Sequence, residues 1–292
     1  MHTATSTGAR SHRIRRVLPS MRALLVAFSV LTALAVGALY VLAEQTQDYF
    51  AWTIQPPLTA AFLGAGYAAG FVLVVLSLRD PVWAHSRVAV LTILVFVVLT
   101  TIATLIHIDR FHFAEQFADS GFLAKAAAWF WLGIYLVVPV LMLALILPQE
   151  RSRGIDPPPR HPVPMGLRGA LAAESLVLSV TGAALYLVPA TSERLWPWTL
   201  TPLTARVVAA WLLAFGLATA LAAFSGDLRR LRTAAIAYTV FGVMVLGAVI
   251  RFYTAVDWDD PPTVTFALVS VAVVLTGAAG WWLAPAPRRF RR

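Results

Sequence analysis

The chain has 292 residues, of which 59% are hydrophobic and 13% are charged, and its mean hydropathy is +0.76. A soluble protein of this length has too little interior to hide so much apolar surface, so the composition excludes that class and predicts an integral membrane protein. The net charge is +9, but the basic residues are divided among many loops and argue against a nucleic-acid partner, while the lack of cysteine excludes disulfides and cysteine-ligated metal sites.

Eight apolar segments are each long enough to cross the hydrocarbon core of a bilayer, which takes about 20 residues. Backbone polar groups find no partner in lipid, so each segment is predicted to be a helix and the fold to be an all-α transmembrane helix bundle. The first segment is kept as a mature helix, because its apolar run is too long for a signal peptide and no clear cleavage site follows. In chain order the predicted spans are 21–43, 57–78, 87–108, 126–147, 167–188, 203–224, 233–253 and 263–283.

The basic residues give the orientation of these spans. The two terminal tails and every second loop hold 18 of the 23 basic residues, whereas acidic residues favour the other side. The basic side is predicted to be cytoplasmic, with both termini in the cytoplasm and anionic lipids as partners at that surface. Arginine far outnumbers lysine, which is typical of a high-GC bacterial genome and suggests a bacterial plasma membrane. The five basic residues on the other side are Arg110, Lys125, Arg194, Arg206 and Arg251.

The chain repeats part of its own sequence. The stretch WTIQPPLTA at residues 52–60 recurs as WTLTPLTA at 198–205, and ALY at 38–40 recurs at 184–186. A repeat unit of about 145 residues holds four spans, and an even number makes the two copies parallel, related by an axis along the membrane normal. This pattern resembles actinobacterial multi-pass membrane proteins of unassigned function that carry the motif W-T-[IL]-x-P-L-T-A, and the resemblance implies no activity.

The predicted organisation follows from the repeat. Two four-helix membrane repeats are expected at residues 21–148 and 165–284, joined by a Pro-rich cytoplasmic linker at 149–164. Basic cytoplasmic tails are expected at 1–20 and 285–292.

The repeated motif itself has a structural interpretation. Trp52 and Trp198 would lie at the headgroup boundary, where tryptophan is enriched. Thr201 would cap a helix whose first residue is Pro202. In the second span, Gly64, Gly66 and Gly70 lack the spacing and the preceding strand of a dinucleotide loop, so they predict close helix packing instead.

The strongest cluster of candidate functional residues lies at the outer end of the third span. Thr100, Thr104 and His107 share one helix face, and these hydroxyl and imidazole groups suit a substrate or ion pathway. If the helix continues outward, Asp109, His112 and Glu115 follow at i+3 steps, and with His107 they form a set that can bind zinc or another divalent cation. No standard metal motif is matched, and the alternative is a hydrogen-bonded cluster without a cofactor.

Three charged residues fall within or at the edges of spans, where ionisable groups are costly and often functional. For Glu174 the alternatives are a proton relay, a cation site, or a structural pair with Arg168 or Arg232. Arg206 and Arg251 are further candidates for the substrate or ion pathway, and the structural alternative is that they meet the outer acidic loops or a lipid phosphate.

These features favour a transporter-like protein or one that handles lipids or small molecules. A non-catalytic membrane scaffold or sensor subunit that binds a protein partner is the first alternative. A membrane enzyme with an outward-facing metal site is the second, although no nucleophile elbow, Walker loop or HExxH motif points to catalysis.

Overall fold

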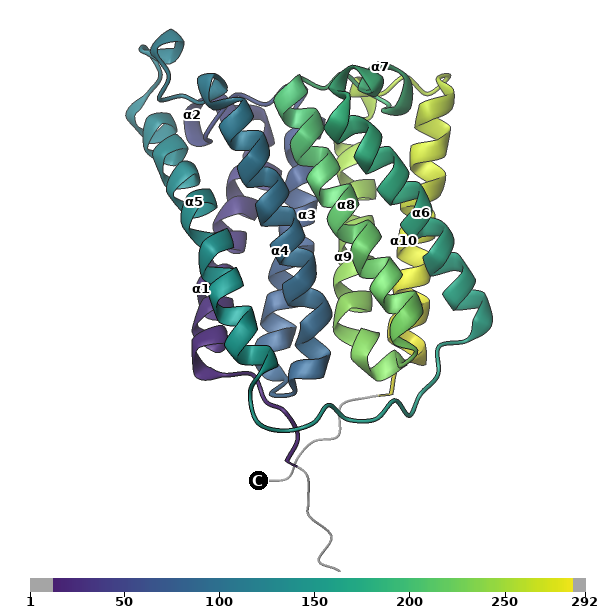
Figure 1. Ribbon diagram of the computed structural model, residues 1–292. Helices are drawn as coiled ribbons and strands as arrows, with labels where there is room; N and C mark the ends of the chain where they lie inside the picture. Colours follow the sequence, from purple (N-terminus) through teal and green to yellow (C-terminus); the bar gives the residue numbers. More distant parts are fainter. Residues whose placement is uncertain (1–12, 286–292) are drawn as a thin grey trace, which may run out of the picture.

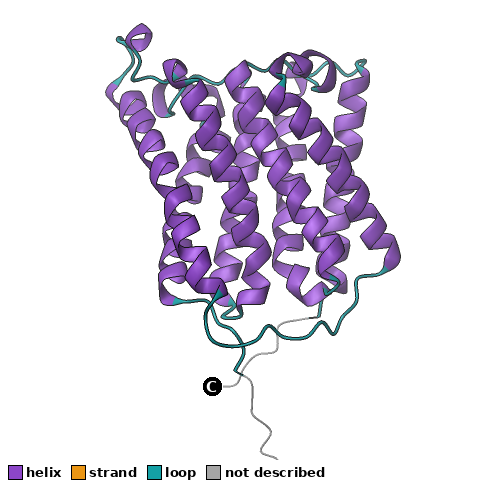
Figure 2. Ribbon diagram, in the orientation of Figure 1, coloured by secondary structure: helices purple, strands orange, loops and turns teal. Residues whose placement is uncertain are grey.

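The computed structural model describes residues 13–285, and the ends of the two predicted basic tails lie outside the described residues. The described chain is an all-α bundle without strands, which confirms the predicted fold class (Figure 2). Eight of its helices are long and apolar enough to cross a membrane, which fits a multi-pass membrane protein.

The long helices follow the predicted spans closely. They are α1 Pro19–Val36, extended by the π-helical η1 Gly37–Val41, then α3 Pro57–Arg79, α4 Trp83–Ile106, α5 Phe122–Glu150, α6 Met165–Leu187, α8 Pro202–Ser225, α9 Leu228–Arg251 and α10 Pro261–Leu283. The connections contain the short helices α2 Thr46–Tyr49 and α7 Ser192–Leu195 and the 3-10 turns η2 Ala43–Gln45, η3 Ile108–Arg110, η4 Glu115–Phe117, η5 Pro189–Thr191 and η6 Tyr253–Ala255.

Four helices form the centre of the bundle and four flank them (Figure 1). At the centre, α3 packs against α9 and α4 packs against α8. On the outside, α1 packs on α3, α5 on α4, α6 on α8 and α10 on α9. In the most apolar stretch of α3 and of α8, 67% of residues are buried, against 22–28% in the four flanking helices. The flanking helices therefore keep broad apolar faces for lipid, whereas α3 and α8 are covered by protein.

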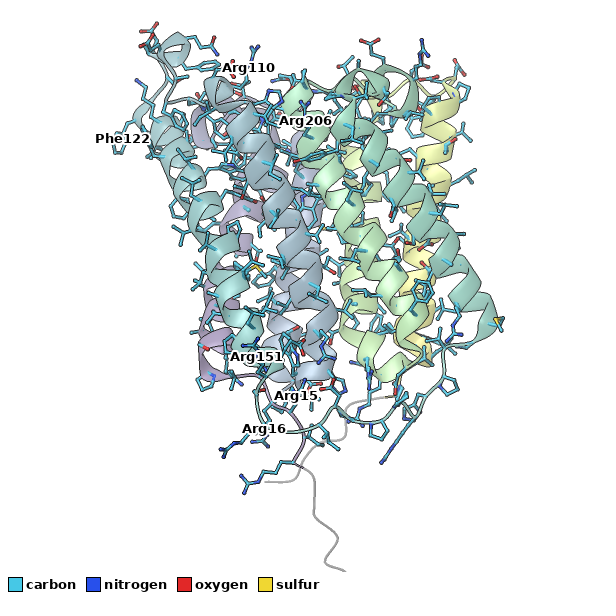
Figure 3. All side chains as sticks on the ribbon, in the orientation of Figure 1. Arg15, Arg16, Arg110, Phe122, Arg151 and Arg206 are labelled. Atoms are coloured by element: carbon cyan, nitrogen blue, oxygen red, sulfur yellow. The ribbon has the colours of Figure 1, made fainter. Side chains whose placement is uncertain are left out.

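The two ends of the bundle differ in charge. Residues 13–18, the linker between α5 and α6 and the C-terminal end of α10 all lie at one end, opposite α2 and α7 (Figure 1). Figure 3 places Arg15, Arg16 and Arg151 at that shared end, and Arg110 and Arg206 at the opposite end. The first group lies on the side that the loop charges predict to be cytoplasmic.

Two glycines on α3 allow neighbouring elements to approach closely. A Cβ atom added at Gly64 would lie 2.7 Å from the backbone nitrogen of Tyr40 in η1. One added at Gly66 would lie 2.6 Å from the indole ring of Trp211 on α8. Both distances are shorter than van der Waals contact allows, so close packing explains these two glycines.

The tryptophans of the repeated motif are inside the protein. Trp52 and Trp198 are only 2% and 6% exposed, so their predicted place against lipid headgroups is wrong. Trp52 packs edge-on against Trp131, with ring centroids 5.0 Å apart. The indole N–H of Trp198 donates to the hydroxyl of Thr59, 2.8 Å away. Both rings therefore contact protein, and the indole N–H of Trp198 has a partner within it.

The start of α8 agrees with the prediction from the sequence. Pro202 is its first residue, and the Thr201 hydroxyl accepts from the backbone N–H of Thr204 at 3.3 Å, as a cap does.

The N-terminal segment is tied to the end of α5 and to the α3–α4 turn. The backbone N–H of Arg15 donates to the carbonyl of Ile155, and the N–H of Trp83 donates to the carbonyl of Arg15. The fully buried Gln149 accepts from the N–H of Leu18 at 2.7 Å and donates to the carbonyl of Arg16 at 3.0 Å. Residues 13–18 are therefore held against this end of the bundle by hydrogen bonds.

Ion pairs reinforce this connection. The Arg87 guanidinium donates to both carboxylate oxygens of Glu150, at 2.7 and 2.8 Å, and to Asp156 at 2.7 Å. Arg15 approaches Glu150 from the other side at 3.2 Å. A bidentate arginine–carboxylate pair fixes direction as well as distance, so the network sets how the linker leaves α5.

The turn between α8 and α9 is held by the linker in a comparable way. The N–H of Leu228 donates to the carbonyl of His161 at 2.8 Å. The Asp227 carboxylate accepts from the N–H groups of Arg229 and Arg160, at 2.8 and 2.7 Å. Asp227 thus caps α9 and also fastens the linker to it.

Candidate functional site

A cavity of about 400 Å³ lies among the eight long helices, each of which contributes to its wall. Its wall is mainly Leu, Val, Ile, Ala and Phe, and none of its described lining residues is charged. The polar groups on the wall are mostly hydroxyls, including those of Tyr67, Tyr135, Tyr238 and Thr276. This size and this mixture of a large apolar area with a few hydrogen-bonding groups are those of a small-molecule site.

Aromatic rings form the part of the wall contributed by α3, α4, α5 and α8. The hydroxyls of Tyr67 and Tyr135 are hydrogen-bonded at 2.6 Å. Trp211 stacks on Phe96 with ring centroids 3.8 Å apart. Each of these contacts joins two helices, so this region of the wall is rigid.

Glu174 lies just behind the opposite region of the wall. It is the tenth residue of α6, about 14 Å along the helix axis from its first residue, and it is 7% exposed. Its carboxyl group accepts hydrogen bonds from the Tyr238 hydroxyl at 3.1 Å and from the Thr276 hydroxyl at 2.9 Å. Since both hydroxyl residues line the cavity, Glu174 is one hydrogen bond away from it.

An ion pair between Glu174 and an arginine was one of the alternatives from the sequence, and the part of the chain that the structure describes does not contain it. In the described residues, neither Arg168 nor Arg232 makes a hydrogen bond or ion pair with it. The guanidinium of Arg168 instead lies near Gly226 at the end of α8. Glu174 is therefore a buried carboxyl group held by hydroxyls alone, an arrangement that is costly for a fixed negative charge.

Two of the other candidate residues meet at the opposite end of the bundle. The guanidinium of Arg206 on α8 lies 2.6 Å from Nε2 of His107, just after α4. Burial lowers the pKa of His107, and the positive charge of Arg206 lowers it further. A neutral imidazole with Nε2 unprotonated is the acceptor that this arginine requires.

Arg251, at the end of α9, has other partners. It donates to the carbonyl of Tyr40 at 2.7 Å and approaches the carboxylate of Glu44 at 3.4 Å. It thus covers exposed carbonyls at the end of the first helix and meets an acidic residue of the outer loops.

The proposed metal ligands are not brought together as a set. Helix α4 ends at Ile106, so the i+3 spacing expected for Asp109, His112 and Glu115 is lost. His112 is 1% exposed, with one ring nitrogen bonded to the carbonyl of Phe50 at 2.8 Å and the other 3.0 Å from the Thr53 hydroxyl. Burial lowers the pKa of His112.

The acidic members of this set lie near the surface. Asp109 pairs with Arg110 at 3.2 Å, and both are more than 60% exposed. Glu115 starts the turn η4. Within residues 13–285, no group of three or more His, Asp or Glu side chains is arranged to hold a metal ion.

The two threonines of α4 have separate surroundings. Thr104 accepts a hydrogen bond from the Trp131 indole at 3.0 Å, and it is 1% exposed. The Thr100 hydroxyl is buried and has no hydrogen-bond partner among the described atoms. Neither lines the cavity.

Sequence reasoning missed four hydroxyl side chains that shape the cavity: Tyr67, Tyr135, Tyr238 and Thr276. A signal was present, because a tyrosine deep within a span must hydrogen-bond its hydroxyl to another part of the protein. Comparisons with protein-family models, with curated proteins and with solved structures find no match for this chain.

Proposed function

We propose that the protein binds an uncharged, lipid-like molecule in the central cavity, as a transporter-like or lipid-handling membrane protein. The cavity of about 400 Å³, with apolar walls and a few hydroxyl groups, is the observation that carries this proposal. An acyl or isoprenoid chain suits such a wall, since dispersion contacts and the exclusion of water both favour it.

The absence of charge on the described wall limits the ligand further. A phosphate group placed there would lose its hydration without gaining an opposite charge, at a cost of several kcal/mol. The part of the ligand that enters the cavity is therefore uncharged, with hydroxyl, ester or carbonyl oxygens that Tyr and Thr hydroxyls can bind.

The second element of the proposal is a tandem duplication of four helices. Exchanging the two halves of the chain leaves the list of packed pairs among the eight long helices unchanged, because α3–α9 becomes α8–α4 and α1–α3 becomes α6–α8. Individual hydrogen bonds also recur about 145 residues apart, such as Trp83 N–H to Arg15 and Leu228 N–H to His161. A cavity between duplicated halves is a common place for a transport site.

The third element is orientation. We propose that the end carrying Arg15, Arg16 and Arg151 faces the cytoplasm of a bacterial cell. The lack of native cysteine makes a direct test simple. With a membrane-impermeant maleimide on intact cells, Glu115→Cys should be labelled and Arg153→Cys should be labelled only after permeabilisation. Labelling of Arg153→Cys on intact cells would reverse the orientation.

Photocrosslinking tests the ligand. The protein is placed in lipid nanodiscs that contain a diacylglycerol with a diazirine near the end of one acyl chain. Crosslinks are expected on cavity residues such as Tyr67 and Trp211, and unlabelled diacylglycerol should compete. Ala218→Phe, which adds volume at the cavity wall, should reduce the crosslinking severalfold. Val180→Phe adds volume at an α6 position that is 60% exposed and outside the cavity, so it should have no effect.

Native mass spectrometry of gently extracted protein provides a second measurement. A retained neutral lipid, lost in Ala218→Phe, supports the proposal. Crosslinks confined to lipid-facing residues such as Trp282, together with a bare protein in the mass spectrum, would reject lipid binding and direct the search to a protein partner.

A further inference from the structure

The hydrogen bonds around Glu174 can serve both charge states of its carboxyl group. The Thr276 hydroxyl lies 2.9 and 3.1 Å from the two carboxyl oxygens, and it also lies 2.9 Å from the carbonyl of Ala272 on its own helix. A hydroxyl has one proton to donate and can accept as well. Its single proton therefore has two alternative acceptors at equal distance.

These two choices define two hydrogen-bond arrangements. When Glu174 is a carboxylate, the Tyr238 and Thr276 hydroxyls both donate to it. When Glu174 is protonated, it donates to the Thr276 oxygen, and Thr276 donates to the Ala272 carbonyl instead. Only hydrogen positions change between the two, so neither charge state leaves an unpaired polar group.

Within residues 13–285, Tyr238 is the one titratable side chain that is hydrogen-bonded or ion-paired to the Glu174 carboxyl group. On α9 the contacting residue is Tyr238, and on α10 it is the neutral Thr276. Helix α8, which packs along α6, has Arg206 as its only charged residue, and that side chain binds His107 at the far end. Arg168 and Arg232 each lie six residues, about 9 Å of helix, from Glu174 and Tyr238 respectively. No fixed charge therefore holds Glu174 in one state.

We propose that Glu174 is a proton-exchange site within the membrane-spanning bundle, and that its charge state sets which hydroxyl groups the cavity offers to a ligand. As a carboxylate it accepts hydrogen bonds from the Tyr238 and Thr276 hydroxyls, which leaves the two hydroxyl oxygens to accept a hydrogen bond from the ligand. As a neutral acid it is a weaker acceptor, so the Tyr238 hydroxyl can donate to the ligand in place of Glu174. Proton exchange is independent of the proposed lipid binding, whereas the coupling to the ligand rests on that function.

Infrared difference spectroscopy on the purified, reconstituted protein tests the exchange. As pH is raised, one carboxylic acid C=O band should convert to carboxylate bands in the wild type, and this conversion should be missing in Glu174→Gln. Thr276→Val and Tyr238→Phe each remove a hydroxyl that donates to the Glu174 carboxyl group. Each variant should therefore shift the midpoint pH of the conversion. Thr219→Val is the matched control, because its hydroxyl also lines the cavity but bonds to the Phe215 carbonyl on its own helix.

Two results would overturn the proposal. One is a Glu174 signal that stays the same from acid to alkaline pH. The other is a conversion whose midpoint pH is the same in Thr276→Val, in Tyr238→Phe and in the wild type. Both variants keep the carboxyl group and lose a hydroxyl alone, so they remain informative if Glu174→Gln fails to fold.

The diazirine-labelled diacylglycerol separates this site from the lipid proposal. If crosslinking in the cavity changes with pH in the wild type but not in Glu174→Gln, the coupling is supported. If Glu174 titrates while no cavity residue is crosslinked, the proton site stands and the lipid proposal fails. If the lipid is crosslinked equally at every pH while Glu174 titrates, the coupling is rejected.

Discussion

The hydroxyl of Tyr40 donates a hydrogen bond to the carbonyl of Met244, 3.0 Å away, and so joins the end of the first membrane helix to α9. A second tyrosine does the same in the opposite direction, because Tyr186 on α6 donates to the carbonyl of Leu99 on α4 at 2.7 Å. The tyrosines are 146 residues apart and the carbonyls 145. Each bond crosses between the halves of the chain, so the pair fastens them together at two places.

Removing these hydroxyls should weaken the bundle slightly and additively. We expect Tyr40→Phe and Tyr186→Phe each to lower the free energy of unfolding in bicelles by about 0.6 kcal/mol, the usual size of an interhelical hydrogen bond in a membrane. The two losses should add, because the sites share no partner. Tyr253→Phe is the control, since that side chain is 63% exposed. A double variant as stable as the wild type would contradict this expectation.

The two motif tryptophans provide a matched pair. Trp198→Phe removes the hydrogen bond to Thr59, whereas the indole N–H of Trp52 has no hydrogen-bond partner among the described atoms. Both changes lose similar ring area, so Trp198→Phe should cost about 1 kcal/mol more in unfolding free energy. Thr59→Val should reproduce that extra loss. Equal costs for the two tryptophan variants would show that the bond to Thr59 adds nothing.

Substitution by alanine should change the stability differently at Gly66 and Gly70, which both lie on α3. The Cβ of Gly66→Ala would lie 2.6 Å from the Trp211 ring and force α3 and α8 apart, at a cost of about 1–3 kcal/mol. The Cβ of Gly70→Ala would lie 3.6 Å from Thr32, an ordinary contact, so helix propensity should leave that variant unchanged or up to about 1 kcal/mol more stable. Thermal unfolding in detergent compares them. Similar melting temperatures would disprove the tight contact.

The contact between His107 and Arg206 should weaken in acid. Burial and Arg206 lower the pKa of His107 below the ordinary value of 6.5, so the unfolded chain binds a proton before the folded one does. Stability from this contact is full above pH 6.5 and is lost as pH falls toward the lowered pKa. His107→Gln keeps an acceptor that does not titrate, so its melting temperature should fall less between pH 7 and pH 5 than that of the wild type. Parallel curves would contradict the assignment.

Hydropathy predicted the eight helices well. Its predicted boundaries were wrong where a polar residue has a hydrogen-bond partner within the protein. The third span was expected to start at Arg87, yet α4 starts at Trp83 and includes His85. The imidazole of His85 is bonded to Asp80 at 2.6 Å, and a partnered polar group can lie at a helix end that hydropathy would reject. The predicted headgroup position of Trp52 and Trp198 was wrong for a related reason. An indole at the end of a span looks the same in sequence whether it faces headgroups or other rings.

Only part of the candidate site could be predicted from the sequence. Glu174 was visible because a carboxyl group inside an apolar span is rare. Its partners were not, since Tyr238 and Thr276 lie 64 and 102 residues further along the chain, and helix periodicity gives faces but not which faces meet. The cavity depends on all eight helices, so no local pattern specifies it.

The N-terminal segment carries a consequence for how the protein is made. Arg15 pairs with Glu150, which follows it by 135 residues, and its backbone bonds to Ile155 beyond that. During synthesis these partners emerge only after α5, when the first four membrane helices have already been translated. Residues 13–18 are therefore translated well before the partners that hold them, so these contacts can form only once α5 has been made.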